Sequence, residues 1–454
     1  MDRGADNFFH FAAALLPDGW AENVRLAVAD GVVVAIERAV RPQATDARLG
    51  AALPGLPNLH SHAFQRGMAG LAERRCASED SFWTWRETMY RFVDRLTPDL
   101  LEAIAALAYV EMLESGFTRV GEFHYLHHDR DGRPFADPAA MSMAIAAAAQ
   151  DSGIALTHLP VFYAHAGFGG VPPEEGQRRF LHGIDGFAAL LDRLRALLSP
   201  LPDAVLGIAP HSLRAVTPEQ LARLVPLAAG PIHMHVAEQV KEVEDCVAWS
   251  GARPVEWLLA NMPVDSHWCF VHATHMKQTE VQAMAASGAA AGLCPITEAN
   301  LGDGLFPAAP FLAAGGGYGI GTDSNILVDA MEELRLLEYG QRLAMRRRNI
   351  FASPSGSTGA ALYRGALRGG AQALGASADL QIGATADFLT LDGDHPSLTG
   401  RKGDALLDGL VFAAGRSAID GVWRRGRRLV EKGRHVRRDA IVARYRRALA
   451  DILA

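Results

Sequence analysis

The chain has 454 residues, of which 49% are hydrophobic, so it is long enough for one large domain and a smaller one. Its formal net charge of −7 argues against nucleic acid or another polyanion as its partner. No apolar run is long enough to span a bilayer, so we expect no membrane partner.

Cysteine usage and the N-terminus indicate the compartment. The four cysteines include no Cys-x-x-Cys pair, and so few in a long chain argue against a disulfide framework. They are Cys76, Cys246, Cys269 and Cys294. Residues 1–6 show no basic segment followed by an apolar one, which argues against a secretion signal. We therefore expect a reducing compartment, the cytoplasm.

The two ends of the chain predict short β-strands. Strands over residues 24–28 and 32–36 flank Asp30-Gly31, a dipeptide typical of tight hairpin turns. Similar strands are predicted over 387–391 and 421–426. We expect residues 1–52 and 380–454 to form a small β-sandwich domain with a C-terminal helix.

Between these ends, short apolar strands alternate with helical segments. The predicted strands cover residues 52–56, 118–123, 154–162, 205–209, 232–236, 268–272, 290–293 and 319–322. Thr97-Pro98-Asp99 is typical of a helix start, and a further helix is predicted to begin near Thr358. Eight repeats predict an α/β fold, a (β/α)₈ TIM-like barrel over 53–379, with a doubly wound open sheet as the alternative.

Metal-ligand residues stand where several of these strands end. His60 and His62 are two residues apart, so on extended chain both side chains face the same way. His235 ends the fifth predicted strand, and Asp323 follows the eighth. Strand C-termini meet at one mouth of a barrel, so we expect these four residues to bind one metal ion. Three imidazoles and a carboxylate suit Zn²⁺, with Fe²⁺ and Mn²⁺ as alternatives.

One ligand and the number of ions need a choice. His233 competes with His235, because both point to the same side of the strand. We favour His235, because Glu238 follows three residues later and can transfer protons beside the metal; the alternative for Glu238 is a helix-capping acid. No lysine lies in the third or fourth predicted strand to bridge two metals, so we expect a single ion.

These motifs resemble a known group over essentially the whole chain. The pattern resembles the one-metal aminohydrolase branch of the amidohydrolase superfamily. It combines His60-x-His62, His235-x-x-Glu238, His272 and Asp323. Segments 57–66, 233–239 and 294–304 are similar to the formimidoylglutamate deiminase family, whose members hydrolyse N-formimino-L-glutamate to N-formyl-L-glutamate and ammonia in histidine degradation. Asn325 departs from the family pattern, which has a histidine there.

The residue types indicate how such a hydrolysis would proceed. A metal-bound hydroxide would attack the electrophilic amidine carbon, with Asp323 accepting the proton of the attacking water. Glu238 would carry a proton to the departing nitrogen, so that ammonia leaves. His272 would polarise the water or the tetrahedral intermediate.

A substrate with two carboxylates requires cationic and hydroxyl donors. Arg86 lies in an aromatic segment after the first strand, and Arg214 follows the fourth. The resemblance implies five substrate-binding residues, namely Gln65, Arg86, Tyr125, His211 and Arg214.

Other interpretations stay open at this stage. The same metal ligands serve deaminases of nucleobase-like rings and could serve a related formimino or guanidino acid. A different class of protein, an inactive barrel scaffold, is disfavoured because Glu238, His272 and the metal ligands are all present. A homodimer is expected by analogy of fold alone.

Overall fold

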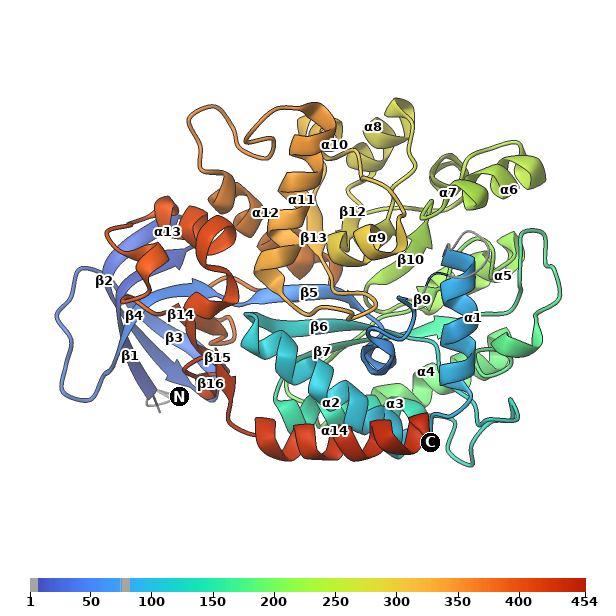
Figure 1. Cartoon of the computed structure of the whole chain (residues 1–454), viewed down its shortest axis with the longest axis horizontal. Coiled ribbons are helices and arrows are strands. Elements are labelled where there is room, and N and C mark those ends of the chain that lie inside the picture. Colours follow the sequence, from blue (N-terminus) through green and yellow to red (C-terminus); the bar gives the residue numbers. More distant parts are fainter. Residues whose placement is uncertain (1–6, 74, 76–81) are drawn as a thin grey trace.

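The structure is a computed structural model that describes residues 7–73, 75 and 82–454, so segment 1–6 and Cys76 lie outside the described residues. Two sheets organise it (Figure 1). One sheet combines strands from both ends of the chain, and the other is parallel and surrounded by helices. None of the described helices is long and apolar enough to cross a membrane.

The parallel sheet closes into a barrel. Its order is β10-β11-β12-β13-β5-β6-β7-β8, with β9 paired to β7. The strands are β5 (Leu56–Ser61), β6 (Phe117–His124), β7 (Ala155–Phe162), β8 (Val205–Leu206), β9 (Ala209–Pro210), β10 (Ile232–Val236), β11 (Trp268–His272), β12 (Ala290–Leu293) and β13 (Tyr318–Ile320). Ile208, between β8 and β9, forms a parallel bridge with Ile232 of β10. This bridge completes the ring and confirms the predicted (β/α)₈ barrel.

Two predicted barrel strands differ from the structure. Residues 52–54 belong to β4 (Ala47–Pro54) of the other sheet, and the barrel strand starts only after Gly55. A Cβ at Gly55 would lie 2.2 Å from the Thr118 side chain, so only glycine lets the chain pass β6 closely and change sheets there. The fourth predicted strand is split into β8 and β9 around Gly207. A Cβ at Gly207 would lie 2.4 Å from the Pro231 carbonyl oxygen, so the chain passes close to its neighbour there as well.

The terminal sheet has the order β17-β16-β15-β14-β4-β1-β2-β3. Besides β4, it contains β1 (Asn7–Leu16), β2 (Gly19–Ala29), β3 (Val32–Glu37), β14 (Phe388–Leu391), β15 (Ile419–Arg424), β16 (Arg427–Glu431) and β17 (Arg434–His435). Asp30 and Gly31 both have positive φ, as the predicted hairpin turn requires. Although β14 and β4 separate β15 from β1, the Trp423 and Phe9 rings lie 6.5 Å apart. The sheet therefore curls around its own aromatic core.

Helices surround the barrel (Figure 1). They are α1 (Phe82–Val93), α2 (Pro98–Glu114), α3 (Ala140–Ser152), α4 (Ile184–Leu198), α5 (Pro218–Leu224), α6 (Val240–Ser250), α7 (Pro254–Asn261), α8 (Gln278–Ser287), α9 (Pro295–Leu301), α10 (Ala308–Ala313), α11 (Ala330–Met345), α12 (Thr358–Ala373), α13 (Asp404–Gly409) and α14 (Arg438–Leu453). Short 3-10 helices occur at η1 (Ala63–Met68), η2 (Glu175–Gln177), η3 (Val225–Leu227), η4 (Pro396–Leu398) and η6 (Gly415–Ala418), and η5 (Leu410–Ala414) is a short π-helix.

The predicted helix caps are present. The Thr97 side chain accepts a hydrogen bond from the Leu100 N–H and opens α2. Ser357 caps α12 in the same way, accepting from the Ala360 N–H at 3.0 Å. The C-terminal helix α14 lies along α2, so the end of the chain covers the barrel (Figure 1).

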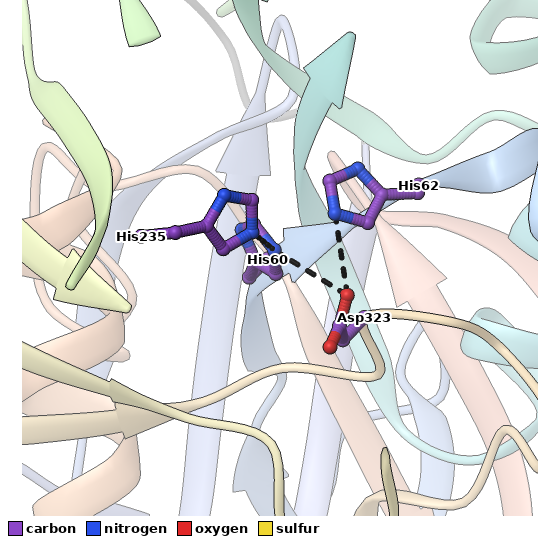
Figure 2. Close-up of side chains that lie close together, drawn as sticks. All are labelled: His60, His62, His235 and Asp323. Carbon is purple, nitrogen blue, oxygen red and sulfur yellow. Dashed lines mark hydrogen bonds and ion pairs between the residues drawn. The ribbon is translucent and has the colours of Figure 1, made fainter. Parts of the chain in front are cut away.

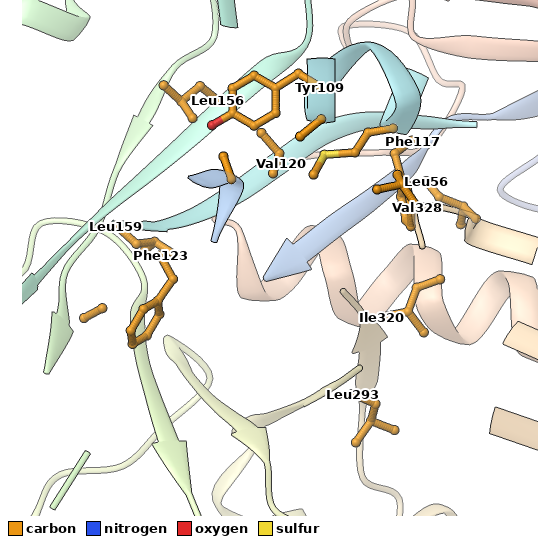
Figure 3. Packing of buried hydrophobic residues seen from close by; sticks show 14 of the residues in the cluster. Leu56, Tyr109, Phe117, Val120, Phe123, Leu156, Leu159, Leu293, Ile320 and Val328 are labelled. Carbon is orange, nitrogen blue, oxygen red and sulfur yellow. The ribbon is translucent and has the colours of Figure 1, made fainter. Parts of the chain in front are cut away.

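The barrel strands are buried on both sides. All residues of β6 and β7 are buried, as expected for parallel strands covered by helices. Figure 3 shows Phe117, Val120 and Phe123 of β6 among these side chains. The division into residues 1–52 with 380–454, and 53–379, stays a prediction.

Candidate active site

The four predicted metal ligands converge at one end of the barrel. His60 lies in β5 and His62 follows it, while His235 is in β10 and Asp323 follows β13. All four are buried, and one ligand atom from each lies within 4.8 Å of the others. Figure 2 shows the three imidazoles and the carboxylate pointing toward one another. The Asp323 Oδ1 atom is 3.3 Å from His62 Nε2 and 3.5 Å from His60 Nε2.

The chemistry of this cluster fits a metal ion. The Nδ1 atoms of His62 and His235 face the carbonyl oxygens of Phe123 at 2.9 Å and His211 at 3.2 Å. Each Nδ1 therefore carries the hydrogen, and each Nε2 presents a lone pair to the cluster. Burial lowers the pKa of all three histidines, that of His60 to about 3, so the rings are neutral. Neutral nitrogens beside a carboxylate suit a divalent cation.

The alternative ligand His233 has another role. Its ring is fully buried one layer deeper, and its Nε2 contacts the Ala373 carbonyl oxygen at 2.6 Å. His235, two residues later, reaches the cluster instead, with its Nε2 3.1 Å from that of His60.

The loop that carries Asp323 is held by Asn325. Its Nδ2 donates to the Ser61 hydroxyl and to the backbone oxygens of His62 and Asp323, each at 3.1 Å. Asp323 and Asn325 both have positive φ, a conformation that these buried bonds stabilise. Asn325 thus connects both ends of the ligand set, a role that the sequence alone did not reveal.

Glu238 reaches the site from a sharp turn between β10 and α6. Ala237 has a φ of 52°, and the buried Glu242 carboxylate accepts the N–H groups of Ala237 at 3.0 Å and Glu238 at 3.1 Å. Helix α6 starts only at Val240, so Glu238 is neither in the helix nor its cap. Burial raises the pKa of Glu238 to about 7, which suits proton exchange near neutral pH.

His272 lies between three carboxylates. Its Nε2 is 3.7 Å from Glu238 Oε1 and from Asp323 Oδ2, and its Nδ1 is 3.2 Å from Glu298 Oε1. Burial disfavours its charge, but the carboxylates outweigh this and raise the pKa of His272 to about 10. Glu298 also accepts the Cys294 N–H at 2.9 Å. It lies in the 294–304 motif, yet its contact with His272 appears only in the folded chain.

A cavity opens above the cluster, and all five predicted substrate-binding residues line it. They are Gln65, Arg86, Tyr125, His211 and Arg214. Gln65 Nε2 donates to the Tyr125 hydroxyl at 2.8 Å. Arg214 is buried and its Nε has no hydrogen-bond partner among the described residues. Helix α1 contributes Tyr90 to the wall, and Tyr163 follows β7; neither was predicted from the sequence.

Comparison with known proteins identifies the family. Residues 51–429 match the amidohydrolase family, and residues 6–50 match the N-terminal domain of formimidoylglutamate deiminase HutF. The chain belongs to the amidohydrolase family. A formimidoylglutamate deiminase from Pseudomonas aeruginosa is 54% identical over 447 residues, which cover 97% of this amidohydrolase and 98% of the relative. The predicted resemblance is therefore confirmed.

Other relatives of this amidohydrolase agree with the fold. The crystal structure of an amidohydrolase from Brucella melitensis is 55% identical, with a TM-score of 0.97 over 99% of this chain and 100% of that one. A 5-methylthioadenosine/S-adenosylhomocysteine deaminase from Natronomonas pharaonis is 30% identical over 81% of this chain and 79% of its own. The Brucella melitensis structure covers nearly the whole chain, and the predicted fold is confirmed.

Proposed function

We propose that this amidohydrolase hydrolyses N-formimino-L-glutamate to N-formyl-L-glutamate and ammonia, a step of histidine degradation. One observation carries the proposal: the buried histidine–aspartate cluster and Glu238 lie at the floor of a cavity whose wall holds Arg86 and Arg214. Two guanidinium groups suit a substrate with two carboxylates. The 54% identity to a formimidoylglutamate deiminase supports the same substrate.

The cluster is proposed to hold one divalent cation, and Zn²⁺ fits its donors best, with Fe²⁺ and Mn²⁺ as alternatives. The ligands are His60, His62, His235 and Asp323. A bound ion supplies a Lewis acid, which lowers the pKa of water to about 7. No lysine occurs in β7, β8 or β9 that could bridge a second ion.

Three side chains handle protons in the proposed reaction. The water oxygen adds to the amidine carbon while Asp323 accepts a proton from that water. Glu238, with a pKa of about 7, delivers a proton to the nitrogen that departs as ammonia. His272, held as a cation by its three carboxylate neighbours, stabilises negative charge on the attacking oxygen through its Nε2–H.

The substrate is held by charge and by hydrogen bonds. Arg86 and Arg214 bind the carboxylate groups of the substrate. Tyr125 and His211 contact the part of the substrate that lies between these arginines and the histidine–aspartate cluster. Gln65 fixes the Tyr125 hydroxyl at 2.8 Å. These proposed roles involve the same five residues that the sequence predicts to bind the substrate.

A substrate panel tests the proposal. Purified, metal-loaded protein is assayed for ammonia release from N-formimino-L-glutamate, N-formimino-L-aspartate, guanidino acids, guanine and adenosine, before and after chelation. We expect N-formimino-L-glutamate to have the highest kcat/KM and chelation to abolish turnover. A preference for a ring substrate would replace the assignment with a nucleobase-like deaminase. Silence on every compound with metal bound would indicate the inactive scaffold.

Two further expectations stay predictions. The homodimer, expected by analogy of fold, is tested by light scattering of the full chain. The cytoplasmic location is tested by fractionation of the cells that produce it.

A further inference from the structure

Behind two tyrosines of the cavity wall lies a buried amide that the proposed reaction does not use. Gln177, at the end of η2, is fully buried. Its Oε1 accepts the Glu174 N–H at 2.9 Å. Its Nε2 donates to the Tyr163 hydroxyl at 2.9 Å and to the Tyr90 hydroxyl at 3.4 Å. Because an amide NH₂ group only donates, both phenol oxygens act as acceptors toward Gln177.

This arrangement leaves the two phenol hydrogens available to a ligand. Tyr90 and Tyr163 both line the cavity, and within residues 7–73, 75 and 82–454 neither hydroxyl donates to an acceptor. Gln65 donates to the Tyr125 hydroxyl at 2.8 Å elsewhere in the same cavity, but that hydroxyl in turn donates to Met89 Sδ at 3.9 Å, so Tyr90 and Tyr163 differ from it. Burial raises the pKa of Tyr90 and of Tyr163, so both phenols keep their hydrogens at neutral pH.

Positive charge lies beside these two donors. Burial raises the pKa of Tyr90 and Tyr163, and the positive charges of Arg86 and Arg214 offset part of this increase. Arg214 is buried with its Nε unpartnered, and no ion pair is found for it in the described part of the chain. Arg86 lies 3.7 Å from Glu174, whose side chain is more than half exposed. The wall therefore combines two O–H donors with two guanidinium groups.

We propose that Tyr90 and Tyr163 determine specificity by donating hydrogen bonds to one substrate carboxylate beside Arg214, and that Gln177 is the positioning residue that orients both phenols. Carboxylate oxygens accept such bonds strongly, and two O–H donors with a guanidinium match the two oxygens of one carboxylate. A nucleobase ring presents N–H donors as well, which this wall does not complement. The inference rests on the proposed function, since it assumes a substrate with two carboxylates.

Single tyrosine variants test the contact. Y163F, Y90F and their double variant are compared with wild type on N-formimino-L-glutamate and on two analogues, each lacking one carboxylate: N-formimino-4-aminobutyrate and N-formimino-L-2-aminobutyrate. We expect each single variant to raise KM for the dicarboxylate about 10-fold to 100-fold, with kcat within about threefold. On the analogue that lacks the contacted carboxylate, the variants should match wild type. Y339F, on the outer face of α11, is the matched control.

The positioning role of Gln177 has its own variant. Q177M keeps the volume of the side chain but loses both donated bonds. We expect it to raise KM for the dicarboxylate as the double tyrosine variant does, again without effect on the matching analogue. A uniform loss of kcat on all three substrates would indicate a merely structural role and would overturn the assignment.

Binding measurements distinguish a failure of this inference from a failure of the proposed function. Calorimetry with glutarate and with N-formyl-L-glutamate measures affinity without turnover. If wild type hydrolyses N-formimino-L-glutamate but the double variant keeps KM and Kd within twofold, the inference fails and the proposed function stands. If wild type hydrolyses no formimino acid, the proposed function fails; weaker glutarate binding by the double variant would then still support the carboxylate site, and equal binding would reject it.

Discussion

At the scale of single residues, buried side chains of the same chemical type have different roles because their surroundings differ. Glu238 faces His272 across 3.7 Å and is surrounded by other acids, whereas Glu242 accepts two backbone N–H groups and fixes a turn. Glu298 combines the two situations, because it accepts from both a backbone N–H and the His272 ring. Glu242 and Glu298 thus support the reacting groups without lining the substrate cavity, whereas Glu238 lies at its floor.

Glu298 is expected to orient His272 for turnover. E298Q keeps the shape of the side chain but removes the charge beside Nδ1, so we expect kcat to fall about 10-fold to 100-fold while KM stays within threefold. Steady-state kinetics measure this. E333Q is the control, because Glu333 accepts the Ile296 N–H at the start of the same helix. An equal loss in both variants would mean that Glu298 acts only by stabilising α9.

Asn325 is expected to support metal binding. N325A removes three donated bonds, to Ser61, His62 and Asp323, so the Asp323 loop loses its fixed position. We expect affinity for Zn²⁺ to fall about 10-fold to 100-fold, measured by competition with a chromogenic chelator. The exposed N349A is the control. Unchanged affinity in N325A would show that the loop holds Asp323 without this side chain.

At the scale of elements, the site depends on connections between strands and helices. Glu122 of β6 accepts the Ala63 N–H of η1 at 2.8 Å and the Tyr109 hydroxyl of α2 at 3.1 Å. Through these bonds the Glu122 carboxyl group connects β6, which lies next to β5, to η1, the turn that follows His60 and His62. Burial raises the pKa of Glu122 to about 8.

This raised pKa predicts a pH-dependent stability. The folded state holds a proton on Glu122 that the unfolded state releases near its ordinary pKa of about 4.5, so the stabilisation is complete below that pH and is lost as pH rises through about 8. We expect E122Q to lower the loss of Tm between pH 6 and pH 9 by about 1–3 °C, measured by calorimetry. The exposed E244Q should keep the slope of wild type. An unchanged slope in E122Q would show that Glu122 is ionised throughout.

At the scale of the whole molecule, the two sheets are joined by buried charge. Arg424 of β15 pairs with Asp203, before β8, at 3.0 Å and with Asp387, just before β14. The arginine-rich segment 424–428 lies at the end of β15, in the turn that follows and at the start of β16, within the terminal sheet. The cluster likewise ties β5, β10 and β13 across the barrel.

Metal removal is expected to destabilise the whole barrel. Because the ligands come from three distant strands, an ion that binds only the folded state adds about 3–4 kcal/mol when its free concentration is about 100-fold to 1,000-fold above Kd. We expect chelation to lower Tm, and added Zn²⁺ to restore it, in calorimetry. H235A is the comparison, and its Tm should not respond to chelation. A chelation effect that persists in H235A would place the stabilising ion elsewhere.

Much of the site could be predicted because its signals are local. The spacing of His60 and His62, and the position of His235 and Asp323 at strand ends, follow from short segments, and the barrel rule then brings them together. Glu298, Gln177 and the role of Asn325 could not be predicted in this way. Glu298 contacts His272, which is 26 residues away in the sequence, and Gln177 contacts Tyr90, which is 87 residues away. Nothing in the local pattern marks such pairs.

The sequence by itself determined the order of strands and helices, the barrel and the types of the metal ligands, because periodicity and strand-end chemistry are properties of neighbouring residues. Only the tertiary structure decided where the first barrel strand starts and which buried amides and acids hold the reacting groups. These depend on contacts such as that between Gly55 and Thr118, which exist only once distant segments lie side by side.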